Sequence, residues 1–289
     1  MRRALLVAAF LALSVRSVHL QVDRPEVRLK PDTTSANTIR VLKVRNDVSM
    51  LQTPGGNITV LAFPEGVTLV DSGSAETADQ VLAAIRALSK QPIRYIINTT
   101  FDPGHIGGND KLGATGIQVT GGNVAGQVGT DGAEIIAHEN LLERMSAKTN
   151  KPAYAARALP QTTYHVDAIK LSTLYHGDGI QVFHVPAAHT DGDSLVYFRR
   201  NDVLATGDVF TTTAYPVIDV AHGGTINGVV DALNKILDIA FPEFRLEGGT
   251  LIVPGPVGGG NGTPPPAPPG PAKSTGSPQD DTPAPENRT

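Results

Sequence analysis

The sequence predicts an α/β fold, in which strands of a sheet alternate with helices that pack on it. Two apolar, β-rich runs, residues 58–63 and 67–70, are joined by residues 64–66 (Pro-Glu-Gly) and predict a hairpin. An amphipathic segment from about Ser74 then leads to the apolar run 93–97. A strand, a helix and a strand in that order indicate a βαβ crossover and a sheet covered by helices.

Composition excludes several classes of function. The chain has 289 residues, 40% hydrophobic and 18% charged, which is typical of a soluble globular protein with one large domain or two small ones. A net charge of -4 gives no reason to expect nucleic acid as a partner. No internal stretch is long and apolar enough to span a bilayer. Cysteine is absent, so a metal site would use histidine and carboxylate ligands.

Both ends of the chain differ from its centre. Residues 1–17 combine two arginines, an apolar run and small residues, which predicts a signal peptide and an exported, periplasmic or secreted protein. A membrane anchor is the alternative, but the run is short for one. Residues 18–38 are predicted to be a linker. Half of the 22 prolines lie from Pro254 onward, so residues 256–289 are predicted to be a disordered tail.

The remaining elements follow from local patterns. Residues 39–45 alternate in polarity and slip phase at Val41-Leu42, which predicts a strand with a bulge. Further strands are expected at residues 49–51, 116–119, 162–174, 179–185, 194–198, 203–205 and 251–253, and further helices at residues 133–145 and 228–241.

The most informative stretch is the polar turn that follows the apolar run 93–97. Residues 98–109 resemble the metal-binding loop of the metallo-β-lactamase superfamily, which reads Asn-Thr-His-x-His-x-Asp-His-x-Gly-Gly-Asn. Thr100 and Asp102 stand at the positions of the first two histidines, and Gly104 stands at that of the aspartate. Only His105 is retained, so the resemblance implies the fold with a degenerate metal site.

Two later loops carry the same resemblance. Residues 189–194 (His-Thr-Asp-Gly-Asp-Ser) are similar to a second family loop, with His189 at the ligand position. The strand 203–205 leads into Gly207-Asp208, similar to the loop whose aspartate is shared by two metals. A surface histidine and a β-turn are the alternatives, and the length of the match at residues 189–194 favours a ligand.

A fourth loop departs from the family pattern. Relatives often read Pro-Gly-His-Gly-Pro where this chain has Pro254-Gly255-Pro256, so a ligand histidine is missing. We hypothesise that the gene is altered near Pro256 and that the tail replaces a helix.

The resemblance implies a metallo-β-lactamase-like four-layer αββα sandwich over residues 39–255. It implies a reduced metal site, with one Zn²⁺ rather than two, and Fe²⁺ or Mn²⁺ also chemically suitable. The expected metal ligands are His105, His189, Asp208 and Asp102. Thr100 and His222 are further candidate residues of the site.

The expected reaction is hydrolysis by metal-activated water, with Asp102 and Asp208 as the catalytic carboxylates. The substrate is expected to be a small molecule carrying an ester, thioester, lactam or phosphoester, and the sequence does not choose among them. The alternative is an inactive, metal-free member of the fold that acts as a binding or vestigial protein. Metal content discriminates between the two.

The remaining histidines and the paired glycines are expected to have structural roles. His138 is expected within the helix 133–145, and His165, His176 and His184 are expected to be structural. The pair Gly107-Gly108 is expected to allow close backbone packing, with phosphate binding as a weaker alternative.

Overall fold

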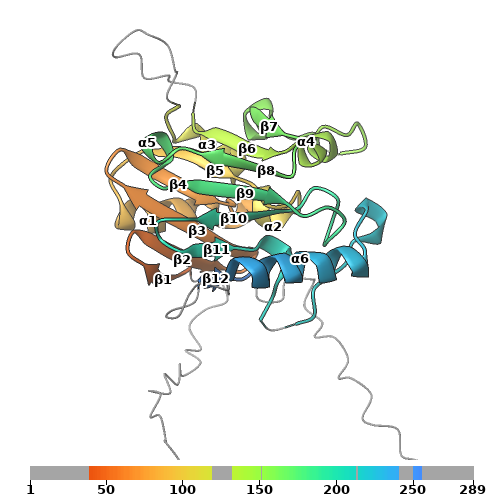
Figure 1. Cartoon of the computed structure of the whole chain (residues 1–289). Helices are drawn as coiled ribbons and strands as arrows, with labels where there is room; N and C mark the ends of the chain where they lie inside the picture. Colours follow the sequence, from red (N-terminus) through yellow and green to blue (C-terminus); the bar gives the residue numbers. More distant parts are fainter. Residues whose placement is uncertain (1–38, 119–131, 151, 213, 241–249, 256–289) are drawn as a thin grey trace, which may run out of the picture. The chain divides into compact units, whose positions relative to one another are not determined.

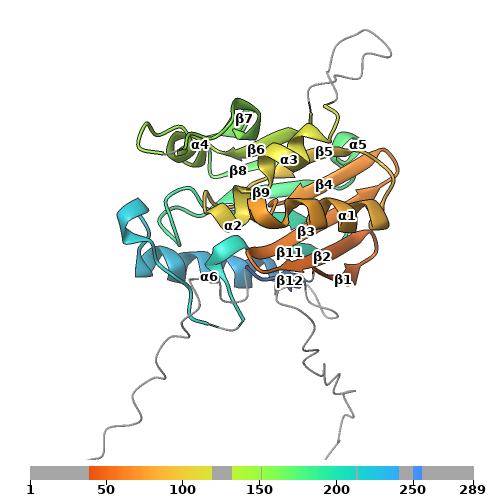
Figure 2. The ribbon, with the colours of Figure 1, turned by 180° about the vertical axis from the view of Figure 1, so that it is seen from behind.

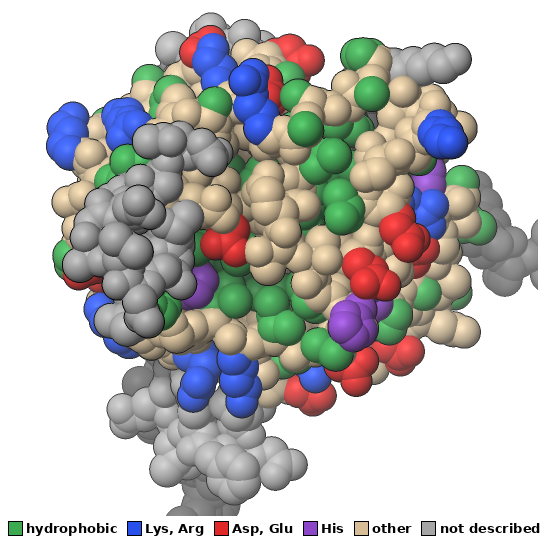
Figure 3. Space-filling model, turned by 90° about the horizontal axis from the view of Figure 1, so that it is seen from above, with side chains coloured by type: hydrophobic (Ala, Val, Ile, Leu, Met, Phe, Trp, Pro, Cys, Tyr) green, Lys and Arg blue, Asp and Glu red, His purple; other side chains and the backbone are tan. Residues whose placement is uncertain are grey.

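The structure is a computed structural model that describes residues 39–118, 132–150, 152–212, 214–240 and 250–255. The predicted signal peptide, linker and tail lie outside these ranges. No helix among the described residues has the length and apolarity needed to cross a membrane. On the face shown in Figure 3, lysine and arginine side chains are spread among acidic and neutral ones and form no basic stripe.

Two sheets pack face to face, and helices cover their outer faces (Figures 1 and 2). The seven-stranded sheet has the order β1-β2-β3-β4-β5-β6-β7, and the five-stranded sheet has the order β12-β11-β10-β9-β8. Figure 2 shows α1 and α3 in front of the first sheet, whereas Figure 1 shows α6 in front of the second. The predicted four-layer αββα sandwich is therefore confirmed.

The strands of the first sheet are β1 (Arg40–Arg45), β2 (Val48–Thr53), β3 (Gly56–Phe63), β4 (Gly66–Val70), β5 (Ile93–Ile97), β6 (Glu134–His138) and β7 (Thr162–Tyr164). Those of the second are β8 (Ala168–Leu171), β9 (Ile180–His184), β10 (Ser194–Phe198), β11 (Val203–Ala205) and β12 (Leu251–Val253). The α-helices are α1 (Ala78–Leu88), α2 (Pro103–Ile106), α3 (Asn109–Ala114), α4 (Glu139–Met145), α5 (Thr173–His176) and α6 (Ile226–Ala240), and the 3₁₀ turns are η1 (Ala75–Thr77), η2 (Ala156–Ala158), η3 (Gly207–Val209) and η4 (Val220–His222).

Three apolar layers hold the sandwich together. Ile97 and Phe198, both fully buried, belong to the core between the sheets. Ile85 of α1 packs with Ile96 on the outer face of the first sheet, and Ile236 of α6 belongs to the cluster on the outer face of the second. Alternate residues of β5 thus belong to two different cores, because successive side chains of a strand point to opposite faces of the sheet and both faces are buried here.

The predicted hairpin and crossover are both present. β3 and β4 pair antiparallel, and β4 pairs parallel with β5 after the excursion through α1. The bulge in β1 falls between Lys43 and Arg45, two residues later than its predicted place.

Three sequence predictions of secondary structure were wrong. The helix expected at residues 133–145 is β6 followed by α4, because the buried Ile135 and Ile136 belong to a strand that pairs with β5 and β7. A short apolar run of this kind fits a buried strand and a helix equally well. The strand expected at residues 162–174 is divided into β7, β8 and the turn of α5. Residues 116–118 form no strand, and residue 119 lies outside the described ranges.

The ends of several strands meet at one edge of the two sheets. β5 runs into α2, and β11 runs into η3. The sheets are joined there because Ser194 N, at the start of β10, donates to Thr99 O over 2.9 Å. Loops that are far apart in the sequence therefore converge at this edge, which is where α/β folds place polar chemistry.

Close backbone packing positions α2 at this edge. A Cβ atom added at Gly104 would lie 2.1 Å from Gly55 O, and one added at Gly108 would lie 2.3 Å from Ser72 O. The second contact agrees with the packing role expected for Gly107-Gly108. The first leaves no room for any side chain at position 104.

We predict that Gly104→Ala lowers the free energy of unfolding by about 1–3 kcal/mol, because backbone must move to admit the methyl group. Gly113→Ala, in α3, is the matched control, since its added Cβ has no neighbour closer than 3.8 Å. That change is expected to be neutral or stabilising by up to about 1 kcal/mol. Urea denaturation measures both, and equal stabilities for the two variants would contradict the steric account.

Candidate metal site

A buried carboxylate lies at the centre of the site. Asp208, in η3, accepts a hydrogen bond from His105 Nε2 at its Oδ1 over 3.1 Å. Its Oδ2 lies 3.7 Å from His189 Nε2. The three side chains that retain the family pattern, taken from three distant loops, are therefore brought together, with one imidazole at each oxygen of the carboxylate.

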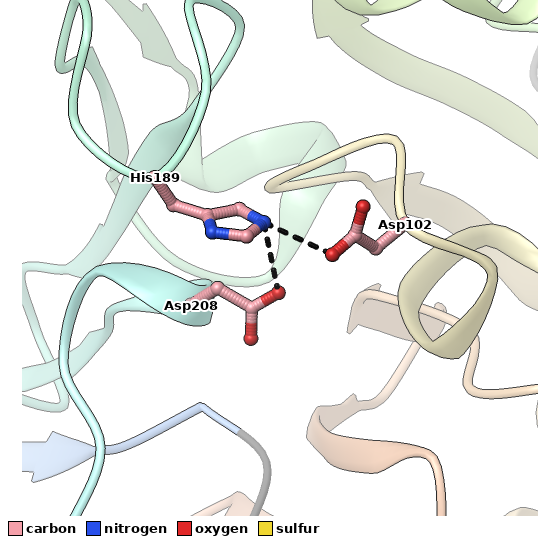
Figure 4. Close-up of side chains that lie close together, drawn as sticks. All are labelled: Asp102, His189 and Asp208. Atoms are coloured by element: carbon pink, nitrogen blue, oxygen red, sulfur yellow. Dashed lines mark hydrogen bonds and ion pairs between the residues drawn. The ribbon is translucent and has the colours of Figure 1, made fainter. Parts of the chain in front are cut away.

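Asp102 completes a compact group around His189. His189 Nε2 lies 2.9 Å from Asp102 Oδ2, and Figure 4 shows this nitrogen facing both carboxylates. One ligand atom from each of Asp102, His189 and Asp208 lies within 4.8 Å of the others. His105 is not a member of this group, although it contacts Asp208. The structure thus associates Asp102 with His189 more closely than with its sequence neighbour His105.

His105 is held from both sides of its ring. Its Nδ1 lies 2.8 Å from Asp71 Oδ2, and its Nε2 contacts Asp208. Burial alone would lower the pKa of His105, but the charges of Asp208 and Asp71 outweigh burial and raise that pKa well above its ordinary value. Without a bound metal, the imidazole is therefore a cation that is held in place by one carboxylate at each ring nitrogen.

Asp71 is a member of the candidate site that the sequence analysis missed. It follows β4, 34 residues before His105, and has a φ of 65°, an uncommon conformation for a residue other than glycine. Its carboxylate also accepts hydrogen bonds from Thr99 N over 2.8 Å and Thr99 Oγ1 over 2.7 Å. The signal that could have identified Asp71 is the polar run after β4, because loops at the ends of buried strands carry site residues.

His189 is oriented by the backbone on its other side. Its Nδ1 donates to Val217 O over 2.9 Å. Burial lowers the pKa of His189, but the hydrogen bond to Asp102 and the charge of Asp208 outweigh it and raise the pKa to about 9. The loop itself is fixed by Asp193, whose two oxygens accept from Thr190 N and Thr190 Oγ1, both over 2.6 Å. This explains the Thr-x-x-Asp part of the motif as a local turn.

The remaining candidate residues differ in their suitability. Thr100 is 1% exposed, and its Oγ1 has no hydrogen-bond partner in the described structure. Gly104 offers no ligand. His222, in η4, is bonded to Asp219 and packs edge-on against Phe101 at 4.9 Å, outside the compact group. Pro256 lies outside the described residues.

The donor set fits a divalent cation. Two carboxylates held near one another repel, and a positive charge between them removes that repulsion. Burial would raise the pKa of Asp208, but His105 and His189 outweigh it and lower that pKa, so the carboxylate is ionised. The aspartate and histidine side chains of this group supply oxygen and nitrogen donors suited to Zn²⁺, Fe²⁺ or Mn²⁺.

The fold and this site define an α/β sandwich with a histidine–carboxylate cluster at the common edge of its sheets. Residues 52–241 match the metallo-beta-lactamase superfamily. This match covers well over half of the chain, and the chain therefore belongs to that superfamily.

Individual relatives are distant. A linear primary-alkylsulfatase from Pseudomonas sp. (strain ATCC 19151) is 28% identical over 189 residues, which cover 57% of this chain. The aligned part is 35% of that relative, so this chain spans about a third of its length. A metallo-beta-lactamase from Pontibacter korlensis has a TM-score of 0.54 at 15% identity, over 70% of this chain and 86% of that one. The DIM-1 metallo-beta-lactamase has a TM-score of 0.52 at 14% identity, over 70% and 84%. These two likenesses show the fold alone.

The other histidines lie outside the compact group. His138 was predicted within a helix, which was wrong: it ends β6 and caps α4, accepting from Asn140 N over 3.3 Å. Its ring stacks on His184 with a centroid separation of 3.7 Å. Burial, followed by the charge of His184, lowers the pKa of His138 to about 4. His138 is thus a neutral structural residue at neutral pH.

We predict that His138 makes folding stability fall as the pH is lowered from about 6.5 toward 4. In that window the unfolded chain binds a proton at this histidine and the folded chain does not. The variant His138→Asn retains a capping side chain but cannot titrate. Between about pH 7 and pH 5, the free energy of unfolding of the wild type should therefore fall by about 1 kcal/mol more than that of the variant, after allowance for solvent screening. Urea denaturation at both pH values measures this, and parallel losses in the two proteins would contradict it.

Proposed function

We propose that this protein is a metal-dependent hydrolase that holds a single divalent metal ion. Zn²⁺ is the metal that we propose. The observation that carries the proposal is the grouping of Asp102, His189 and Asp208, whose ligand atoms lie within 4.8 Å of one another. These three side chains would hold the metal.

A bound divalent metal supplies a Lewis acid that brings the pKa of water toward 7. The protein's own residues supply position and proton transfer. Asp208 is fixed by His105, which is fixed in turn by Asp71. The side chain of Asp102 is 33% exposed, whereas that of Asp208 is 12% exposed. Asp102 is therefore the carboxylate that substrate and solvent reach, and we assign it the role of accepting the proton from the attacking water.

A single ion is favoured over two by the backbone around Gly104. In the family pattern an aspartate at this position would serve the second metal, but here Gly55 O occupies the place where that side chain would begin. The other ligand of the second half-site is missing at Pro254-Gly255-Pro256 in the sequence. His105 is left with Asp71 and Asp208, which pair with it as a cation.

The substrate class remains that of a small molecule with an ester, thioester, lactam or phosphoester. The name of the curated relative adds a sulfate ester to this set. The basic and apolar start of residues 1–17 supports export to the periplasm or the medium as part of the proposal.

One observation favours the alternative of a metal-free binding protein. Both imidazoles of the site are already paired with carboxylates, His105 with Asp71 and His189 with Asp102. Because these ion pairs satisfy buried groups without a metal, the fold does not depend on metal for stability at this site. Metal content therefore decides between the two functions.

We predict that the purified full chain contains about one equivalent of divalent metal and hydrolyses simple esters, and that His189→Ala lowers metal content and activity by about a hundredfold or more. The reason is that His189 is the one nitrogen donor of the compact group. Plasma emission and an ester hydrolysis assay measure the two quantities.

The control is His165→Ala, which removes an exposed histidine outside the compact group and should leave both quantities unchanged. A wild-type protein without metal, and without activity on addition of zinc, would establish the binding protein instead.

A further inference from the structure

Exposed apolar side chains gather on one loop beside the metal site. Among the described residues, the four most exposed large apolar side chains are Tyr215 (84%), Val220 (75%), Val217 (66%) and Ile226 (63%). All four fall within a stretch of the chain that connects η3 to the start of α6. Single exposed apolar side chains are ordinary, whereas several that share one segment can form a binding surface.

The backbone of this loop is hydrogen-bonded directly to the ligand loop. Val217 O accepts from His189 Nδ1, and Asp219 N donates to His189 O, each over 2.9 Å. Thr225 N donates to Ala187 O over 2.8 Å. The apolar side chains are therefore carried on a main chain that touches the imidazole of His189, within one side-chain length of the cluster.

The same loop also reaches the opposite side of the site. His222 packs edge-on against Phe101, the residue before Asp102, with ring centroids 4.9 Å apart. Asp191 N donates to His222 O over 3.0 Å. The loop thus contacts both His189 and Phe101, the neighbour of Asp102.

The charges at this edge do not suit a ligand held by cationic side chains. Arg144, the arginine bonded to this edge, donates to both carboxylate oxygens of Asp191 and to His222 O. Asp102 and Asp208 contribute negative charge. An apolar rim beside an acidic, metal-binding centre fits a molecule with a hydrocarbon chain and a polar end that meets the metal.

We propose that Tyr215, Val217 and Val220 form a wall, here called the apolar wall, that binds the hydrocarbon chain of the substrate. The substrate is then an amphiphile whose hydrolysable bond lies at its polar end. This inference rests on the proposed function, since it names the substrate class of the same site. Burying each methylene of the chain against the wall strengthens binding by about threefold.

The test uses the full, zinc-loaded chain and straight-chain carboxylates of increasing length, which bind without being hydrolysed. Calorimetry should show affinity rising by about threefold per methylene in the wild type. The triple variant Tyr215→Ser, Val217→Ser and Val220→Ser should lose most of this dependence. It keeps the carbonyl of Val217, and therefore the hydrogen bond to His189.

The matched control replaces one tyrosine and two aliphatic residues that are exposed elsewhere: Tyr175→Ser, Val166→Ser and Leu237→Ser. It should retain the full chain-length dependence. Equal dependence in the wall variant and the control would overturn the proposal. So would a wild-type dimer that the wall substitutions alone dissociate, because the surface would then be a subunit interface.

A second measurement separates this inference from the proposed function. In ester hydrolysis, the wall variant should raise KM for long chains far more than it raises KM for short chains. Hydrolysis with no chain-length preference would reject the wall and keep the hydrolase. Chain-length-dependent binding of carboxylates without any hydrolysis would reject the hydrolase and keep the wall.

Discussion

The contact on which the site depends is the carboxylate of Asp208 held between two imidazoles. Asp208 follows β11 of the five-stranded sheet, whereas His105 follows β5 of the seven-stranded sheet, so their hydrogen bond connects the two sheets at their common edge. A buried carboxylate requires partners that satisfy its oxygens, and here both partners come from loops distant in sequence. The bond between Ser194 N and Thr99 O fixes the same edge through the backbone.

The two sides of the site are unequal for a steric reason. On the side of His189 the donors Asp102 and Asp208 face one nitrogen. On the side of His105 the turn before β3 approaches α2 so closely that Gly55 O takes the space of a side chain at position 104. The packing of α2 therefore excludes a side chain at position 104.

Polar order inside the site is combined with apolar exposure at its rim. The carbonyl of Val217 orients His189, while the side chain of the same residue is 66% exposed. One loop thereby performs two tasks, since its main chain orients His189 and its side chains present an apolar surface. Changes to those side chains can alter what binds without altering how His189 is held.

The sequence alone determined the strands bounded by clear signals and the loops that carry His105, His189 and Asp208. β5 was located to the residue because Pro92 precedes it and a polar turn ends it. The nature of residues 134–138, by contrast, depended on pairing with β5 and β7, which local periodicity does not contain. Tertiary structure likewise decided the role of Asp71 and the pairing of Asp102 with His189, 87 residues away. Convergence of side chains depends on how strands are ordered in the sheets, and that order is fixed by packing between distant segments.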